Sequence, residues 1–281
     1  MVMKTPEQLK GAIRNIAKNN ELQAQEVLQL FLFERLLERL SLSPYKNNFI
    51  LKGGLLISSI IGIAGRTTMD MDLTAEEISM EEENLKHIFK SIFAIDTGDG
   101  IVFTIDRLAP IHTSEDHKNY RIYLTASYGK IQSKMKIDTT SGDIITPAPI
   151  EYSFITLFDE KAIPIMAYTL ETIIAEKYLT ILRLGIANTR ARDFYDLFRI
   201  FKLYNRRINK KNLKLAAEHT AAQRKISDLI KDGPKICAEI KKSQELMNIW
   251  QNYAKDFSYA ADITFAEIIS SVIKINKMLK S

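Results

Sequence analysis

The feature that most constrains the fold is one stretch, FILKGGLLISSIIGIAGRTTMDMDL, at residues 49–73. It opens with a short apolar run over residues 49–51, which is typical of a buried strand. Gly53 and Gly54 then form a turn, and the apolar segment over residues 55–64 predicts a buried helix that ends at Gly65. The stretch therefore predicts a strand, a tight turn and a buried helix in succession.

Two carboxylates follow this segment, at Asp70 and Asp72. Side chains in a strand alternate between its faces, so both carboxylates project from one face while Met71 points into the core. Carboxylates held this close raise each other's pKa unless a cation lies between them. A hard divalent ion with oxygen ligands, Mg²⁺ or Mn²⁺, suits such a pair. The pair predicts a metal site; the alternative is a surface pair without a ligand.

The glycine turn is a candidate phosphate site. Gly53 and Gly54 offer backbone N–H groups at a helix start, with no side chain in the way. Lys52, Arg66 and Thr68 lie next to the turn and the carboxylates in the sequence and are further candidates for nucleotide contact. These parts together predict a nucleoside triphosphate at the helix start and metal ions on the next strand. The structural alternative is an ordinary strand-to-helix turn.

The order of these parts resembles the signature of the nucleotidyltransferase superfamily, a Gly-Ser turn, a short helix and then D-x-D. It is most similar to the AbiEii/AbiGii toxin family of bacterial toxin–antitoxin and phage-defence systems. The chain departs from the signature at Gly54, which stands where the family has Ser. A hydroxyl contact to phosphate is therefore missing at this position.

A lysine on an apolar helix face is the next candidate. Leu170, Ile173, Ile174 and Ile181 form the apolar stripe of a helix that Thr169 can cap, and Lys177 falls on the same stripe. A lysine in that position either extends along the apolar surface to reach water or meets an anion. The periodicity leaves both possibilities open.

The helix predicted over residues 188–204 carries Arg190, Asp193, Asp196 and Leu197 near one face. The sequence A-E-K followed by R-x-x-D-x-x-D-L is similar to the second signature of the AbiEii-like family. The resemblance implies that Lys177 reaches the triphosphate and that Asp193 lies in the active site, with Asp196 structural. Arg190 and Asp193 can also form an ordinary ion pair one helical turn apart.

A third carboxylate, Asp138, lies at the end of a predicted strand. Runs of strand character cover residues 101–108, 120–127 and 130–138, and Gly129 predicts a hairpin between the last two. Asp138 alternates with apolar neighbours and falls on the polar face. The resemblance implies that this position supplies a third metal ligand; the alternative is an exposed turn residue.

The remaining elements follow from caps and periodicity. Thr5 and Pro6 predict the start of the first helix, and the strongly apolar segment 21–40 predicts a helix buried on more than one side. Ser79 and Glu82 predict a capping box. The C-terminal part predicts helices over residues 210–222, 225–231, 235–256 and 264–279, divided by Gly233-Pro234 and Asp262.

Charge is distributed unevenly along the chain. The net charge is +5, but residues 1–200 hold 23 Lys and Arg against 26 Asp and Glu, whereas residues 201–281 hold 16 against 8. A basic C-terminal part beside a carboxylate-bearing N-terminal part predicts a surface that grips a polyanion. The alternative is a set of solvated helix faces.

Several site classes have no support. The lone Cys237 excludes a disulfide framework and a cysteine-rich metal site. The four histidines, at positions 87, 112, 117 and 219, lack the spacing of metal ligands. The start MVMKTPEQLK has no apolar signal core, and no apolar run is long enough for a membrane span. We therefore predict a cytoplasmic protein without membrane contact.

These features together predict an α/β fold, with a nucleotidyltransferase-type mixed sheet and flanking helices in residues 1–167 and a mainly helical domain in residues 168–281. The resemblance implies a toxin that uses Mg²⁺ (or Mn²⁺) and a nucleoside triphosphate to add nucleotides to an RNA, such as a tRNA. It also implies an antitoxin encoded alongside. In the predicted site, Asp70, Asp72, Lys177 and Asp193 are catalytic.

Two other functions remain possible from the sequence. A transferase with the same metal site could modify a protein or a small molecule, although the basic C-terminal part favours a nucleic acid. A nucleotide-binding interaction module without turnover is the second, and Gly54 is the feature that favours it.

Overall fold

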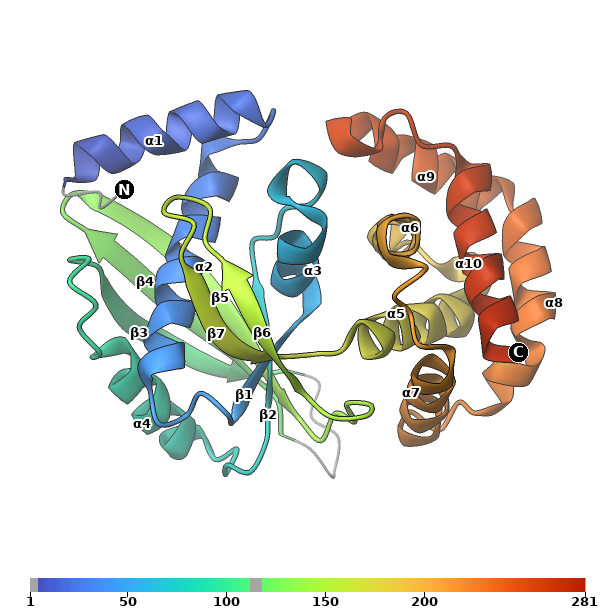
Figure 1. Cartoon of the computed structure of the whole chain (residues 1–281), viewed down its shortest axis with the longest axis horizontal. Coiled ribbons are helices and arrows are strands. Elements are labelled where there is room, and N and C mark those ends of the chain that lie inside the picture. Colours follow the sequence, from blue (N-terminus) through green and yellow to red (C-terminus); the bar gives the residue numbers. More distant parts are fainter. Residues whose placement is uncertain (1–4, 112–117, 281) are drawn as a thin grey trace. The chain divides into compact units, whose positions relative to one another are not determined.

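The computed structural model describes residues 5–111 and 118–280 (Figure 1). The chain divides into two compact units. The sheet unit comprises residues 1–143 and 150–167, and the helical unit comprises residues 144–149 and 168–281. Some of the predictions from the sequence concern His112, His117 and the first four residues, which lie outside the described residues. None of the described helices has the length and apolar character needed to cross a bilayer.

The described part of the sheet unit contains a seven-stranded mixed sheet with strand order β3-β4-β5-β2-β1-β7-β6. Strands β1 and β7 are parallel, as are β2 and β5, and the other neighbours are antiparallel. The strands are β1 (Phe49–Lys52), β2 (Met71–Ala75), β3 (Val102–Pro110), β4 (Tyr120–Tyr128), β5 (Ile131–Ser141), β6 (Ile150–Ile155) and β7 (Ala162–Ala167). The helices are α1 (Pro6–Asn19), α2 (Ala24–Leu42), α3 (Gly53–Ile61), the 3₁₀ turn η1 (Ile63–Gly65) and α4 (Glu82–Phe93).

The two faces of the sheet differ, and this difference positions the site. The ring of Phe49 packs against Phe89 of α4 with centroids 5.1 Å apart, so α4 covers the face to which Phe49 points. Because Lys52 is three residues further along β1, it points to the opposite face, together with its cross-strand partner Asp72. The predicted site residues of β1 and β2 therefore lie on the sheet face that α4 does not cover.

Helix α2 covers the same face as α4. The hydroxyl of Ser133 on β5 donates to Gln29 of α2 at 3.4 Å, and α2 also packs against α4 and β7. The prediction that this helix is buried on more than one side is confirmed. Its buried residues include apolar Phe33 and Leu37 and also charged Glu34 and Arg39.

Most element predictions for this unit are confirmed. The three strand runs and the hairpin at Gly129 are present, and the Gln8 N–H donates to Thr5 at the start of α1 at 3.2 Å. The apolar helix, however, ends at Gly62, whose φ of 94° no ordinary helix continues, rather than at Gly65. The residue that caps α4 is Glu81, so the capping box predicted from Ser79 is wrong.

The helical unit is built from helices that pack around α5 and α10. Thr169 caps α5 by accepting the Thr172 N–H at 3.1 Å, as predicted. Helix α5 packs on α6 and α7, and α10 packs on α6 and α8. The described elements are α5 (Leu170–Leu184), η2 (Gly185–Ala187), α6 (Ala191–Tyr204), α7 (Lys210–Gln223), α8 (Asp228–Lys242), α9 (Gln244–Asp256), η3 (Ser258–Ala260) and α10 (Phe265–Lys280).

The predicted break at Gly233-Pro234 is wrong. Helix α8 continues through both residues, and the actual break between α8 and α9 is at Ser243, which caps α9. Packing explains why the glycine is in the helix. A Cβ at Gly233 would lie 2.3 Å from Nδ2 of Asn276 and 2.8 Å from the Tyr178 hydroxyl, so the side chains of α5 and α10 occupy that space. Local propensity is overridden by this close approach.

We predict that Gly233→Ala destabilises the protein by about 1–3 kcal/mol, because the added methyl group must displace Asn276 or Tyr178. Gly11→Ala in α1 is the matched control. A Cβ there meets nothing within 4 Å, so the change should stabilise by about 0.5–1 kcal/mol through helix propensity. Urea unfolding of both variants measures the difference. A stabilised Gly233→Ala variant would contradict the packing explanation.

Candidate active site

Four charged side chains form a row across the sheet. The cross-strand register pairs Lys52 with Asp72, Asp72 with Asp138, and Asp138 with Arg121. Residues directly opposite on neighbouring strands point to the same face and lie about 5 Å apart. The order along the row is thus cation, carboxylate, carboxylate, cation. It brings together three predicted site residues and adds Arg121, which the sequence analysis missed.

The glycine turn lies against Asp72. The N–H of Gly54 donates to Oδ2 of Asp72 at 3.3 Å. A Cβ at Gly53 would lie 2.0 Å from the same oxygen, and the φ of 63° at Gly53 disfavours a side chain independently. Gly53 is therefore required both for the backbone conformation and for the approach of the carboxylate to the start of α3.

The departure from the family signature at Gly54 has a steric reason. A Cβ at this position would lie 2.7 Å from Oγ1 of Thr68 and 3.1 Å from Nη2 of Arg66. A serine would therefore collide with the threonine hydroxyl. Thr68 itself donates to the carbonyl oxygen of Asp70 at 3.1 Å, which fixes the threonine next to the first carboxylate.

Asp70 directly precedes β2, and Met71 between the two carboxylates is completely buried, as predicted. Oδ1 of Asp70 is buried without a hydrogen-bond partner, and its ion pair with Lys136 is long, at 3.9 Å. An anionic oxygen left in this state favours a cation. With Asp72 beside it, the donor set fits a hard divalent ion such as Mg²⁺ or Mn²⁺.

The electrostatics of Asp72 point the same way. Burial raises the pKa of Asp72 above its ordinary value. The charge of Lys52 and the Gly54 N–H oppose this effect, while the carboxylates of Asp138 and Asp70 add to it. A divalent cation between these carboxylates would relieve both the burial and the repulsion.

Asp138 is differently placed from its prediction. It lies inside β5, which continues to Ser141, rather than at the end of a strand. Arg121 holds both of its oxygens, with Nε 2.7 Å from Oδ1 and Nη2 2.6 Å from Oδ2. Within residues 5–111 and 118–280, no group of three or more His, Cys, Asp or Glu is arranged to hold a metal ion. The role of Asp138 as a third ligand stays a prediction.

Lys52 is anchored on the far side of Asp72. Its ammonium lies 2.5 Å from Asp143 and 2.6 Å from Thr140, and Thr74 also donates to Asp143 at 2.6 Å. Burial alone would raise the pKa of Asp143, but the lysine and the hydroxyls lower it to about 2. Asp143 is thus a permanent anion that holds Lys52, and it is a second residue that the sequence analysis missed.

Signals for both missed residues exist in the sequence. Arg121 stands on the polar side of an alternating strand, and Asp143 follows the end of that strand's partner by two residues. Neither signal is sufficient, because the register between strands decides which polar residues become neighbours.

The helical unit also holds a buried charge cluster. Lys177 lies 2.7 Å from Asp193 and 2.8 Å from Asp196, and Nε of Arg190 lies 2.9 Å from Asp193. Burial would lower the pKa of Lys177, but the two carboxylates outweigh it and the pKa is raised. Of the two possibilities from the sequence, the lysine meets anions. The catalytic roles of Lys177 and Asp193 stay predictions.

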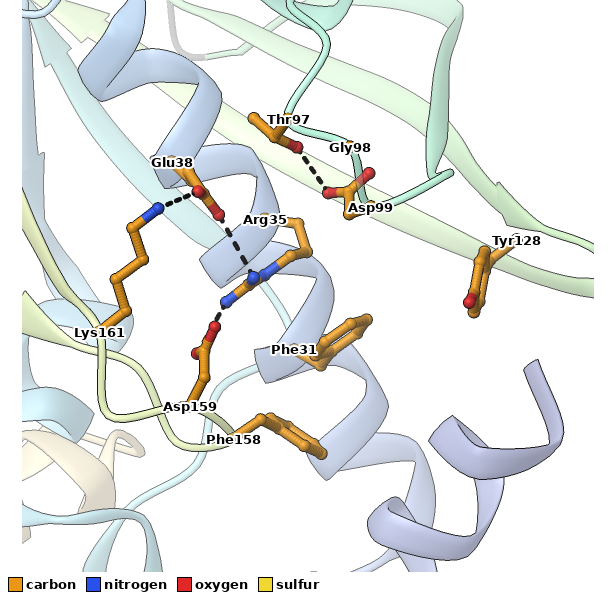
Figure 2. A pocket seen from close by; sticks show the side chains of 10 residues that line it. All are labelled: Phe31, Arg35, Glu38, Thr97, Gly98, Asp99, Tyr128, Phe158, Asp159 and Lys161. Atoms are coloured by element: carbon orange, nitrogen blue, oxygen red, sulfur yellow. Dashed lines mark hydrogen bonds and ion pairs between the residues drawn. The ribbon is translucent and has the colours of Figure 1, made fainter. Parts of the chain in front are cut away.

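A cavity of about 200 Å³ lies on the α2 side of the sheet unit (Figure 2). Its charged residues are all paired, Asp99 with Arg39 and the others with one another. Arg35 lies 3.3 Å from both Glu38 and Asp159, and Lys161 also contacts Glu38. The lining residues are Phe31, Arg35, Glu38, Thr97, Gly98, Asp99, Tyr128, Phe158, Asp159 and Lys161. Because α2 covers the other sheet face, this cavity is separate from the charged row.

Residues 35–271 match the family model described as nucleotidyl transferase AbiEii toxin, type IV toxin–antitoxin system. No curated protein matches the chain.

Two solved structures resemble the chain. The first is a Helicobacter pylori protein described as a nucleotidyltransferase, with a TM-score of 0.49 and 19% identity over 92% of this chain and 98% of that chain. The second is JHP933 from Helicobacter pylori, with a TM-score of 0.47 and 18% identity over 92% and 95%. These likenesses concern the fold alone. The family match covers most of the chain, and the chain therefore belongs to the AbiEii family of nucleotidyl transferase toxins of type IV toxin–antitoxin systems.

Proposed function

We propose that the protein transfers nucleotides from a nucleoside triphosphate to an RNA acceptor, a tRNA, in a reaction that depends on Mg²⁺ or Mn²⁺. The observation that carries the proposal is the pair Asp70 and Asp72 beside the glycine turn, with one carboxylate oxygen buried and without a hydrogen-bond partner. Such a site offers metal ligands next to a helix start that accommodates phosphate.

Each part of the site has a proposed task. Asp70 and Asp72 would hold the divalent ion, whose charge would favour activation of an acceptor hydroxyl and departure of pyrophosphate. Gly53 and Gly54 at the start of α3 are assigned to phosphate binding through their backbone, since Asp72 and Thr68 lie where their side chains would be. Lys52 and Arg66 add fixed positive charge near that start, since Nη2 of Arg66 lies 3.1 Å from the position of a Cβ at Gly54.

We assign Lys177 to triphosphate binding and Asp193 to the reaction on the basis of the family signature. Asp196 is fully buried against Lys177 and is assigned a structural task, the orientation of the lysine. The family belongs to a toxin–antitoxin system, so an antitoxin is the regulatory partner. We propose a cytoplasmic location for this pair.

The acceptor assignment rests on exposed basic residues. Arg206, Arg207, Lys210, Lys211 and Lys214 are all exposed around the start of α7. Together they offer five positive charges within nine residues of the chain. Such a cluster fits an RNA backbone better than a small molecule.

Pyrophosphate release separates the candidate functions. The protein is incubated with Mg²⁺ and each triphosphate, together with tRNA, with total protein or without an acceptor. Release that requires tRNA supports the proposal, and release that requires protein supports a protein-modifying transferase. If the protein binds triphosphate but releases no pyrophosphate under any condition, the result supports a nucleotide-binding interaction module without turnover.

We predict that Asp70→Asn and Asp72→Asn each lower nucleotide transfer at least about a hundredfold, because a lost metal ligand costs several kcal/mol of transition-state stabilisation. Thermal stability should stay unchanged or rise, since one of two repelling charges is removed. The control is Asp106→Asn, which removes a carboxylate that pairs with Lys134 on the same sheet. Wild-type transfer by either site variant would contradict the metal-site assignment.

We further predict that replacing Arg206, Arg207, Lys210, Lys211 and Lys214 by Gln together weakens tRNA binding and its salt dependence. Each lost phosphate contact should make the negative slope of log K against log salt shallower by about 0.7. Filter binding between 50 and 200 mM salt, at about five concentrations, measures the slope.

The matched control replaces five exposed basic residues of the sheet unit, Lys10, Arg14, Lys18, Lys90 and Lys130. This variant has the same net charge, so it reports the effect of overall charge. If both five-fold variants bind tRNA equally, the α7 cluster is a solvated helix face. The acceptor would then be sought among proteins or small molecules.

A further inference from the structure

The ion pair between Arg121 and Asp138 ends the charged row and also determines which cation Asp138 binds. Both carboxylate oxygens of Asp138 accept hydrogen bonds from the guanidinium, at 2.7 and 2.6 Å. A metal ion near Asp72 would therefore have to compete with Arg121 for either oxygen. Yet Asp138 is the cross-strand neighbour of Asp72, and its charge contributes to the raised pKa of Asp72. The arginine therefore occupies the carboxylate that is nearest to the proposed metal ligands in the row.

A divalent ion at Asp70 and Asp72 would change this balance. It carries twice the charge of the guanidinium and would attract the neighbouring carboxylate of Asp138. The same ion repels Arg121. A triphosphate that arrives with the ion brings new anionic oxygens, and the fork of N–H donors that fits a carboxylate also fits a phosphate.

We propose that Arg121 is a phosphate-binding residue that is stored on Asp138 before the nucleotide binds. When the metal–nucleotide complex arrives, Arg121 gives up Asp138 to the divalent ion and transfers to the phosphates of the nucleotide. This inference rests on the proposed function and assigns to Arg121 a contact with the substrate.

The burial of the two partners is consistent with such an exchange. The side chain of Arg121 is 31% exposed, whereas that of Asp138 is 16% exposed. The arginine is thus the outer partner and can turn without passing through the core. Asp138 is held by its position inside β5, so it stays beside Asp72 whichever cation it binds.

The exchange predicts that Arg121→Gln changes the affinities for Mn²⁺ and for triphosphate in opposite directions. With Asp138 released, binding of Mn²⁺ alone should become about tenfold tighter, which corresponds to the loss of one charge-assisted hydrogen bond that competes with the metal. Binding of a triphosphate in the presence of Mg²⁺ should become about tenfold weaker, because a phosphate contact is lost. If the ion pair were purely structural, Arg121→Gln would lower the melting temperature but would not tighten Mn²⁺ binding and weaken triphosphate binding together.

Isothermal titration with Mn²⁺, and then with ATP, GTP, CTP and UTP in turn in the presence of Mg²⁺, measures both affinities. Arg121→Lys keeps the charge without the fork and should fall between wild type and Arg121→Gln. The control for a general charge effect is Lys134→Gln, since Lys134 lies on the same face of β5 but pairs with Asp106. This control should leave both affinities unchanged.

A double-mutant cycle with Asp138→Asn decides whether Arg121 acts through Asp138. In the Asp138→Asn background, Arg121→Gln should no longer tighten Mn²⁺ binding. If the tightening persists there, or if Arg121→Gln binds the triphosphates as wild type does, the exchange is overturned. Failure of the wild-type protein to bind either Mn²⁺ or any triphosphate would instead overturn the proposed function on which the inference rests.

Discussion

Like-charge repulsion is the constraint on which this site depends. Asp72 and Asp138 are neighbours on parallel strands, and Asp70 directly precedes β2 next to them. Three carboxylates so close together cost free energy unless cations surround them. The sheet provides a cation at each end of the row, and each is fixed by an anion: Lys52 by Asp143, and Arg121 by Asp138 itself. The flanks of the row are thus neutralised, whereas the negative charges of Asp70 and Asp72 lie between them.

The sequence was sufficient to predict the parts of the site that follow from local rules. Strand alternation predicted the buried Met71 between two carboxylates, and this is confirmed. The glycine pair predicted a phosphate site, which stays a prediction, and the structure places the Asp72 carboxylate against the Gly54 N–H. Arg121 and Asp143 could not be found in this way. Their importance arises from the register of β4 on β5 and from the loop after β5, and a shift of one residue would turn Arg121 to the other face.

The errors in the helices have the same physical origin. Gly233-Pro234 has strong local signals for a break, but α8 continues because the missing side chain admits Tyr178 and Asn276 from neighbouring helices. Lys177 is the opposite case. Its position on an apolar stripe was ambiguous, and two buried carboxylates on α6, sixteen and nineteen residues further along the chain, decide its environment. Both outcomes depend on partners that local periodicity does not identify.

The contact between Gly53 and Asp72 means that the carboxylate row can be disturbed without changing any charged residue. Because a methyl group at position 53 would occupy the place of an Asp72 oxygen, Gly53→Ala displaces a carboxylate without removing a single charge. A chain altered at this one glycine would keep its net charge, its basic surface and every acidic residue. Expressed in living cells, such a form would separate the effects of the carboxylate row from those of the protein's other surfaces.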